Sequence, residues 1–221
     1  MTADERRAAA RELAAKAAAD GEPLRWFEEL YAAADRGQAV VPWADLAPNP
    51  ILQQQVDALG VRGLRTLVVG CGYGDDAAFL AAEGAIVTAF DIAPSAVERC
   101  RSRFADRDIA WQVASATAPP DEWVHAFELV VEIFTLQVLP PDERAPAGRA
   151  LGRCVAPGGR LFVYCRARDP EDAEGTMPWP LTADEVQGLA IDGLAVERFE
   201  DFLDAEEPPV RRFLAVLRRS P

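Results

Sequence analysis

Residues 67–76 read Leu-Val-Val-Gly-Cys-Gly-Tyr-Gly-Asp-Asp, which places three glycines between an apolar run and a segment typical of a helix. Glycine permits positive φ and, having no Cβ, lets a ligand approach the backbone closely. The stretch therefore predicts a turn that follows a strand, opens a helix and holds a ligand. We expect that ligand to contact Gly70, Cys71, Gly72 and Gly74.

A carboxylate follows at the end of the next predicted strand. Asp91 stands there, followed by Ile92. A carboxylate at this position of a nucleotide-binding unit can accept hydrogen bonds from both hydroxyls of a ribose. The turn and Asp91 together indicate an adenosine-type ligand, and we expect Ile92 to contact it as well.

The residues after the turn narrow the class of ligand. A dinucleotide fingerprint of the G-x-G-x-x-G type would need glycine at position 75, where this chain has Asp75, followed by Asp76. Two carboxylates at a helix start oppose a pyrophosphate. They favour a cationic ligand without phosphate, such as S-adenosylmethionine. An alternative is that both aspartates only cap the helix, which does not exclude the first interpretation.

Short apolar runs alternate with amphipathic segments along the middle of the chain. Strands are predicted near residues 64–69, 85–90, 109–113, 128–131 and 160–165, and helices near 75–82, 94–104 and 141–154. This alternation predicts a doubly wound α/β fold, in which helices cover both faces of a parallel sheet. Residues 157–159, Pro-Gly-Gly, predict a tight turn into the strand at Arg160.

The pattern changes at both ends of this alternation. After a loop at residues 169–180, we expect a helix near 182–189 and two strands near 194–202 and 210–217, whose short connection makes them antiparallel. At the other end, helices are predicted at 2–20, 23–36 and 51–59, with Leu24, Phe27, Leu30 and Tyr31 on one face of the second. We expect residues 1–49 to form a helical extension and residues 50–221 to form one domain.

The amino-acid composition limits the expected binding partners and the expected cellular compartment. The chain of 221 residues carries 36 acidic and 23 basic residues, a net charge of −13, so nucleic acid and anionic membranes are not expected partners. Four cysteines without a C-x-x-C pair and the single His125 argue against a metal site. The alanine-rich start lacks the pattern of a signal peptide, so we expect a cytoplasmic protein with reduced, mostly buried cysteines.

These residues resemble the seven-stranded class I methyltransferases over about residues 50–218. The resemblance rests on the glycine turn, on Asp91, on the Phe-Glu-Leu-Val-Val run at 127–131 and on the Ala-Pro-Gly-Gly-Arg-Leu run at 156–161. It implies a Rossmann-like sheet with strand order 3-2-1-4-5-7-6 and an antiparallel last strand. It also implies S-adenosylmethionine as cofactor and S-adenosylhomocysteine as product.

A narrower resemblance is to the branch that contains thiopurine and tellurite methyltransferases. It rests on the Phe-Glu-Glu-Leu-Tyr run at 27–31, on Pro42-Trp43 and on the prolines at 48 and 50. In that branch the N-terminal segment closes over the cofactor, which implies a cofactor contact for Trp43 and a substrate contact for Tyr31. The alternative is that Trp26, Phe27 and Tyr31 are only core residues. Where the family often has an acidic residue for the adenine amino group, this chain offers Ser115, or the backbone of Ser115 and Ala116.

The acceptor is expected outside the carboxyl ends of the fourth and fifth strands, because ligands of open α/β sheets bind there. Glu132 could accept a proton, orient the substrate, contact the cofactor or only bond a loop backbone. Arg166 and Arg168 could bind an anionic substrate group or pair with neighbouring carboxylates. The remaining expected contacts are Thr135, Gln137 and, on a substrate lid at 169–180, Trp179. The C-terminal arginines at 211, 212, 218 and 219 are expected to be solvated, on an edge-type strand.

The sequence thus predicts an S-adenosylmethionine-dependent methyltransferase that acts on sulfur, oxygen or nitrogen of a small molecule, as a monomer or a homodimer. Sulfur fits the narrower resemblance, and a thiolate needs least help from the protein. Two alternatives remain at this point. One is a binding protein that keeps the cofactor and lacks turnover, and the other is a nucleotide-dependent oxidoreductase.

Overall fold

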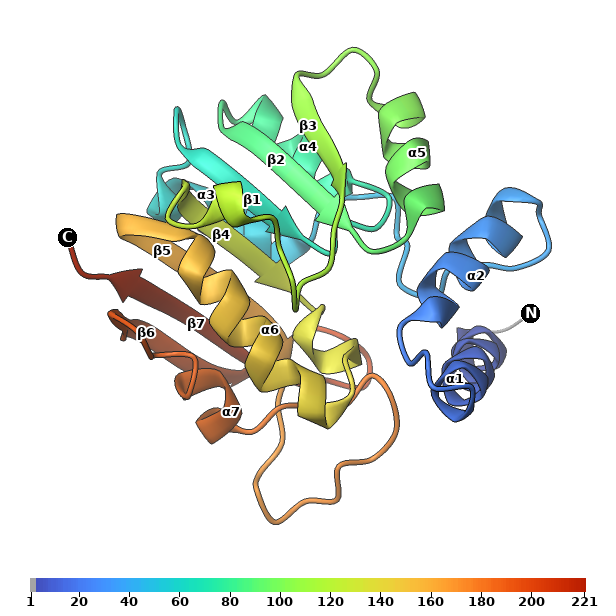
Figure 1. The fold of residues 1–221 in the computed structure, drawn as a ribbon. Coiled ribbons are helices and arrows are strands. Elements are labelled where there is room, and N and C mark those ends of the chain that lie inside the picture. The colour runs from blue at the N-terminus through green and yellow to red at the C-terminus, as the bar shows by residue number, and fades with distance from the viewer. Residues whose placement is uncertain (1–2) are drawn as a thin grey trace. The chain divides into compact units, whose positions relative to one another are not determined.

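The computed structural model describes residues 3–221, and its seven strands form one sheet in the order β3-β2-β1-β4-β5-β7-β6 (Figure 1). This confirms the expected strand order and the Rossmann-like fold. The strands are β1 (Arg65–Val69), β2 (Ile86–Asp91), β3 (Ile109–Val113), β4 (Phe127–Ile133), β5 (Val155–Arg166), β6 (Leu194–Leu203) and β7 (Arg211–Arg219).

Strand direction follows the lengths of the connections. β2 pairs with β3, β1 with β4, and β4 with β5, all in parallel, and a helical segment connects each of these strands to the next in sequence. β7 pairs antiparallel with both β5 and β6, and only residues 204–210 separate β6 from β7. That connection is too short for a crossover helix, so the expected antiparallel last strand is confirmed.

The chain divides into two compact units. The first unit comprises residues 1–63 and 71–115, and it holds β2, β3 and helices α1 (Ala3–Ala19), α2 (Arg25–Asp35), α3 (Pro50–Leu59), α4 (Asp75–Ala82) and α5 (Pro94–Arg103). The amphipathic α2 buries Trp26, Phe27, Leu30 and Tyr31, which confirms most of the expected apolar face. Leu24 instead precedes the helix as its N-cap residue. Residues 3–49 all lie within this unit.

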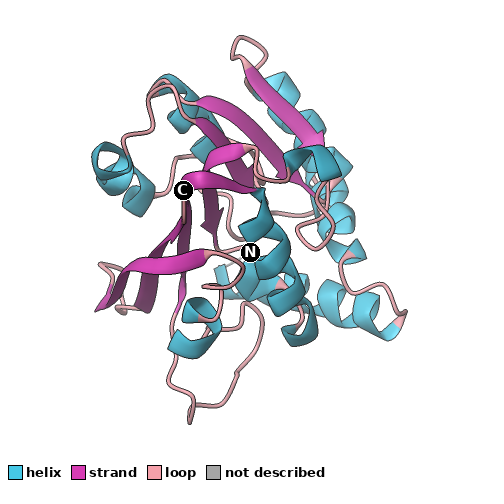
Figure 2. Ribbon diagram, turned by 60° about the vertical axis from the view of Figure 1, so that its left-hand side comes forward, coloured by secondary structure: helices cyan, strands magenta, loops and turns pink. Residues whose placement is uncertain are grey.

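The second unit comprises residues 64–70 and 116–221, and it holds the other five strands with α6 (Pro141–Cys154), α7 (Ala183–Gln187) and two short 3₁₀ turns, η1 (Asp121–Trp123) and η2 (Leu136–Val138). Thr182 and Glu185 form a capping box that starts α7. A long loop connects β5 to α7 (Figure 2). Among residues 3–221, no helix has the length and apolar character needed to cross a membrane.

The expected turn before the fifth strand is not observed. The Pro-Gly-Gly segment at 157–159 does not make a turn before the fifth strand, because β5 already begins at Val155. The segment lies inside the strand instead. The pairing with β4 shifts there from Phe127 opposite Val155 to Leu129 opposite Arg160, and Gly158 takes a φ of 73°. The extra residues are accommodated as a bulge, which glycine permits.

The C-terminal arginines are not all solvated as expected. β7 lies between β5 and β6, so the edge strand is β6. Arg212 is 3% exposed and pairs with Asp204 and Glu206, and Arg219 is 8% exposed and donates to the carbonyls of Asp192 and Gly152. Arg211 and Arg218, in contrast, are partly exposed in surface ion pairs. Burial of an arginine requires such partners, and here the β6–β7 connection supplies those of Arg212, while α6 and the segment before β6 supply those of Arg219.

Candidate functional site

The glycine turn, residues 70–74, has the left-handed backbone that its sequence predicted. Gly72 and Gly74 have φ angles of 53° and 86°, which residues with a Cβ rarely adopt. A Cβ on Gly72 would lie 3.1 Å from the Tyr31 hydroxyl oxygen, and one on Gly74 would lie 2.7 Å from the Trp111 ring. The Cys71 amide donates to the Phe90 carbonyl at 2.8 Å, which ties the turn to β2. The turn is therefore closely packed, and a Cβ would be crowded by Tyr31 at Gly72 and would clash with Trp111 at Gly74.

Asp91 lies at the end of β2 and is bonded directly to this turn. One carboxylate oxygen accepts from the Gly72 amide at 2.9 Å and the other from the Ala93 amide at 2.9 Å, and the residue is 6% exposed. Burial raises its pKa to about 6, although the backbone amides of Ala93, Gly72 and Ile92 act to lower it. Each oxygen keeps one further acceptor position, so the carboxylate can also bind a vicinal diol. The residues present thus fit a ribose.

The two aspartates after the turn have protein partners. Asp75 forms a bidentate pair with Arg103 at 2.7 and 3.0 Å, and Asp76 accepts from the Asn49 amide at 2.6 Å. The α4 N-cap, Gly74, has no side-chain cap, so these carboxylates do not simply cap the helix. Because Arg103 neutralises Asp75, the pair opposes a ligand phosphate less than the sequence suggested. The acidic helix start is therefore weaker evidence against pyrophosphate than we expected.

The structure places Tyr31 at the glycine turn, with the residues expected to hold the cofactor. The Tyr31 side chain is buried, and its hydroxyl accepts from the Trp43 indole N–H at 3.0 Å. Trp43 itself is 39% exposed, so its ring remains available to a ligand. Trp26, Phe27 and Tyr31 are 1%, 9% and 2% exposed, so all three are buried, as the alternative of core residues expected.

Contacts between α2 and α5 were not found by sequence reasoning. Glu28 accepts from the Ser95 amide at 2.9 Å and from its hydroxyl at 2.6 Å, and Asp35 accepts from Arg99 at 2.7 Å. The Arg99 guanidinium in turn lies 4.5 Å from the centre of the Tyr73 ring in the glycine turn. Glu28 and Ser95 are far apart in sequence, so no local pattern could have indicated their pairing. The helix that carries Tyr31 is thereby fixed to the helix that follows Asp91.

The chain after β3 runs beside Asp91. The Ala114 amide donates to the Asp91 carbonyl at 3.1 Å, and the next residue, Ser115, is half-buried. Ala116 is 8% exposed. This is the position at which the sequence predicted an adenine contact.

Glu132, in the second unit, is fully buried at the end of β4. Its Oε1 accepts from the amides of Thr135 and Leu136 at 2.7 and 2.9 Å, while its Oε2 is buried without a hydrogen-bond partner. Burial raises its pKa to about 7, and the two amide donors act to lower it. Of the alternatives weighed above, bonding of a loop backbone is therefore observed. The Oε2 atom, which has no hydrogen-bond partner, can also accept a proton.

Gln137 and Arg168 are used by the fold itself. Gln137 is 4% exposed, its side-chain oxygen accepts from the Arg166 amide at 2.7 Å, and its carbonyl accepts from the Trp179 amide at 2.8 Å. Arg168 donates to the carbonyl of Pro180 at 3.1 Å and to two carbonyls of the 169–180 loop. The Gln137 side chain thus joins η2 to the end of β5, and the Arg168 side chain holds the 169–180 loop. The Arg168 guanidinium also lies 3.9 Å from the carboxylates of Glu174 and Glu185, which is the pairing with carboxylates that the sequence left open.

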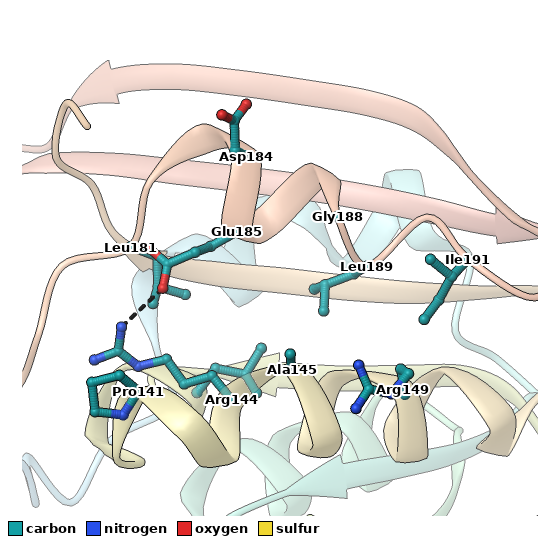
Figure 3. A pocket seen from close by; sticks show the side chains of 11 residues that line it. Pro141, Arg144, Ala145, Arg149, Leu181, Asp184, Glu185, Gly188, Leu189 and Ile191 are labelled. Carbon is teal, nitrogen blue, oxygen red and sulfur yellow. Dashed lines mark hydrogen bonds and ion pairs between the residues drawn. The ribbon is translucent and has the colours of Figure 1, made fainter.

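A pocket of about 320 Å³ lies between α6 and α7 of the second unit (Figure 3). Arg144 of α6 reaches across it to Glu185 of α7 at 2.9 Å, and its guanidinium lies 5.4 Å from the centre of the Trp179 ring. Trp179 thus packs beside Arg144 and does not belong to the lining. The apolar part of the lining consists of Leu136, Pro141, Ala145, Leu181, Leu189 and Ile191.

Comparison with known proteins shows similarity to methyltransferases. Residues 67–159 match the model of a methyltransferase domain. A ubiquinone biosynthesis O-methyltransferase of Pseudomonas fluorescens is 30% identical over 140 residues, 62% of this chain and 59% of that protein. A probable thiol methyltransferase 2 of Arabidopsis thaliana is 25% identical over 152 residues, 68% of this chain and 66% of that protein. The match to the first relative therefore spans less than two thirds of its length.

A solved structure extends the likeness to the whole chain. It is a 1,6-didemethyltoxoflavin-N1-methyltransferase of Burkholderia thailandensis with bound 1,6-didemethyltoxoflavin and S-adenosylhomocysteine. It covers 100% of this chain and 92% of its own, with a TM-score of 0.65 and 15% identity. The TM-score shows that the two proteins share a fold. At 15% identity the likeness shows no more than that, so the site must be argued from this chain's own residues.

Proposed function

Since the chain belongs to the class I methyltransferase superfamily, we propose that it transfers a methyl group from S-adenosylmethionine to a sulfur, oxygen or nitrogen atom of a small molecule. The observation that carries the proposal is the buried Asp91 carboxylate bonded to the Gly72 amide. In this proposal the carboxylate is the acceptor for the ribose hydroxyls, and its bond to the Gly72 amide holds it at the glycine turn. A relative named as a thiol methyltransferase supports sulfur among the possible acceptor atoms.

The cofactor, when bound, supplies a methyl group that its sulfonium already activates. In this proposal Asp91 accepts the ribose hydroxyls, and Ile92 packs against the adenosine. Ser115 and Ala116 receive the adenine, with the backbone at Gly70, Cys71, Gly72 and Gly74 and the exposed Trp43 ring as further contacts. Tyr31 belongs to this set as well, because its hydroxyl lies beside Gly72. Residues 1–49 then act as a cover, which the bonds of Glu28 to Ser95 hold against α5.

Glu132 and Arg166 are the proposed catalytic residues of the acceptor side. A carboxyl with a pKa of about 7 exists in both protonation states at neutral pH, so Oε2 of Glu132 can take a proton from a hydroxyl, amine or thiol. Arg166, at the end of β5, would hold an anionic group of the acceptor. We keep Gln137, Arg168 and Trp179 as residues that shape this region through the 169–180 loop, which the proposal treats as the substrate lid.

The proposal includes a small-molecule partner, a cytoplasmic location, and a monomer or homodimer. The net charge of −13 supports the first point, because such a charge repels nucleic acid and anionic lipid. Size-exclusion chromatography coupled to light scattering would measure the oligomeric state.

Two measurements test the function. Isothermal calorimetry with S-adenosylhomocysteine should show binding, and thermal stabilisation by NAD without stabilisation by S-adenosylmethionine would instead indicate an oxidoreductase. A labelled-methyl screen over thiols, phenols, amines and chalcogen oxyanions should then find an acceptor. Cofactor binding with every acceptor silent would indicate the alternative of a non-catalytic binding protein.

A further inference from the structure

The first glycine of the turn, Gly70, packs against a side chain that follows β4. A Cβ on Gly70 would lie 2.3 Å from Oγ1 and 3.0 Å from Cγ2 of Thr135, and real Cβ atoms do not come as close to another atom as the first of these distances. Gly70 and Thr135 both belong to the second unit. Glycine at position 70 is therefore required by a protein side chain, in addition to any ligand.

Thr135 is held through its amide, its hydroxyl and its carbonyl. The amide donates to Oε1 of Glu132 at 2.7 Å, the hydroxyl donates to the Val69 carbonyl at 3.2 Å, and the carbonyl accepts from the Val138 amide at 3.2 Å. Val69 is the last residue of β1 and pairs in register with Glu132. A single residue thus connects the buried carboxylate of β4 with the backbone that enters the glycine turn.

The chain reaches Thr135 through an unusual backbone conformation at Phe134. The φ of Phe134 is 65°, in the left-handed region that a bulky residue rarely adopts. Its amide donates to the Tyr164 carbonyl of β5 at 3.0 Å, and the centres of the two rings lie 5.1 Å apart. Such a conformation persists only where the surrounding structure imposes it, and it is frequent at functional sites. Contacts with β5 therefore fix the turn on which Thr135 lies.

The hydroxyl of Thr135 controls the orientation of the next peptide group. The peptide bond between Val69 and Gly70 is planar, so the direction of the Val69 carbonyl sets the direction of the Gly70 amide. We propose that Thr135 is a positioning residue of the methyl transfer. Its hydroxyl sets the first peptide of the glycine turn, while its amide holds Glu132. This inference rests on the proposed function, in which Gly70 contacts the cofactor and Glu132 serves the acceptor.

Calorimetry with S-adenosylhomocysteine, at a temperature well below the Tm of every variant, tests the role of the hydroxyl. Thr135→Val keeps the shape of the side chain and removes the hydroxyl, so the affinity should fall about tenfold, the effect of one lost hydrogen bond. Thr135→Ser keeps the hydroxyl, so its affinity should stay within about threefold of that of the unmodified protein.

Thr66→Val is the matched control for these variants. It also removes a hydroxyl that donates to a carbonyl, that of Leu64 at 3.2 Å, but it does so at the start of β1. Its affinity for S-adenosylhomocysteine should equal that of the unmodified protein, even where its Tm is lower. The comparison separates a general loss of stability from an effect on the turn.

A comparison of stabilities tests the packing of Gly70 without any ligand. Gly70→Ala should lower the Tm, because the left-handed backbone is strained by a Cβ and because that Cβ clashes with Thr135. Thr135→Ala removes the two atoms nearest to the new Cβ, so Gly70→Ala should lower the Tm less in that background. Equal losses of Tm in the two backgrounds would contradict the packing on which the inference rests.

The binding measurements can also overturn the positioning role. Unchanged affinity for S-adenosylhomocysteine in Thr135→Val contradicts it, and a raised KM for the acceptor in that variant would then show that Thr135 contacts the acceptor. Equal losses of affinity in Thr135→Ser and Thr135→Val would assign the effect to packing of the methyl group. If the unmodified protein does not bind S-adenosylhomocysteine, the proposed function fails instead, and the Tm comparison still decides whether Thr135 requires glycine at position 70.

Discussion

The glycine turn of the first unit and the strand ends of the second unit both carry polar residues, but the fold uses them differently. At the turn, Asp91 bonds two amides and keeps acceptor positions for a ligand. At the strand ends, the side-chain oxygen of Gln137 and the guanidinium of Arg168 are occupied by backbone groups. A polar residue at a strand end is thus a candidate for binding only after its backbone partners have been counted.

The largest expected effect is at the turn. Replacing Asp91→Ala should weaken binding of S-adenosylhomocysteine at least about 100-fold in calorimetry, because each hydrogen bond to a charged acceptor contributes about 1.5–3 kcal/mol. Asp106→Ala serves as control, since it removes one negative charge from a side chain that is 82% exposed. An unchanged dissociation constant in the Asp91 variant would refute the ribose role.

The second largest effect concerns Glu132, the strand-end residue whose Oε2 remains unpartnered. Glu132→Gln should lower kcat about 100-fold for a phenol, which must lose its proton to a base during transfer. The same variant should retain most of its kcat for a thiol that is already ionised at the assay pH. Glu128→Gln on the same strand is the control, because that side chain is part-exposed and pairs with Arg65. Equal losses for both acceptors would show that Glu132 acts through the η2 turn and not as a base.

The sequence predicted the backbone of the glycine turn better than the partners of the polar residues at the strand ends, and the reason is physical. The conformation of Gly72 and Gly74 and the position of Asp91 follow from local backbone requirements and from strand order, which the residue pattern contains. The partners of Gln137 and of Glu28 are backbone and side-chain groups that lie far away in sequence. Only the folded chain brings such groups together, so no sequence motif predicts these contacts.

The predictions for the C-terminal arginines and for the aspartates of α4 were wrong for the same reason, because their partners lie on other elements. Arg212 was expected in water because its strand was taken as an edge, whereas the strand order places β7 inside the sheet. Asp75 was expected to carry a free charge, whereas Arg103, from a different helix, neutralises it. Charge in a sequence is therefore a poor guide to the field at a site until its partners are known.

A smaller effect, on the free energy of unfolding, tests whether Gln137 stabilises the fold and does not bind the substrate. Gln137→Ala should lower the free energy of unfolding by about 1–3 kcal/mol in urea titrations, since it leaves the part-buried Arg166 amide without its acceptor. KM for the acceptor should change less than about threefold if the side chain has no substrate contact. Gln53→Ala, at an exposed position, is the control. A large rise in KM with unchanged stability would instead return Gln137 to the substrate site.

The smallest expected effect distinguishes Asp75 from Asp76, the two carboxylates at the start of α4. Burial raises the pKa of Asp76 from 3.8 to about 6, so the folded state disfavours its charged form. The stability that this group contributes is fully present below its unfolded pKa of 3.8 and is lost as the pH rises through about 6. Asp76→Asn keeps an oxygen for the Asn49 amide and removes the charge. It should therefore stabilise the protein by about 1 kcal/mol at pH 8, a rise in Tm of about 2–4 °C, with almost no change near pH 3.5.

Asp75→Asn is the matched comparison, because it breaks the bidentate pair with Arg103 and should lower Tm at pH 8. Opposite signs for adjacent aspartates would show that Asp76 is a desolvated acceptor and Asp75 an ion-pair partner. If Asp76→Asn lowered Tm at pH 8 as Asp75→Asn does, the charge of Asp76 would be stabilising in the fold. The helix start would then carry negative charge toward the turn after all, and the sequence-based argument against a pyrophosphate ligand would regain its force.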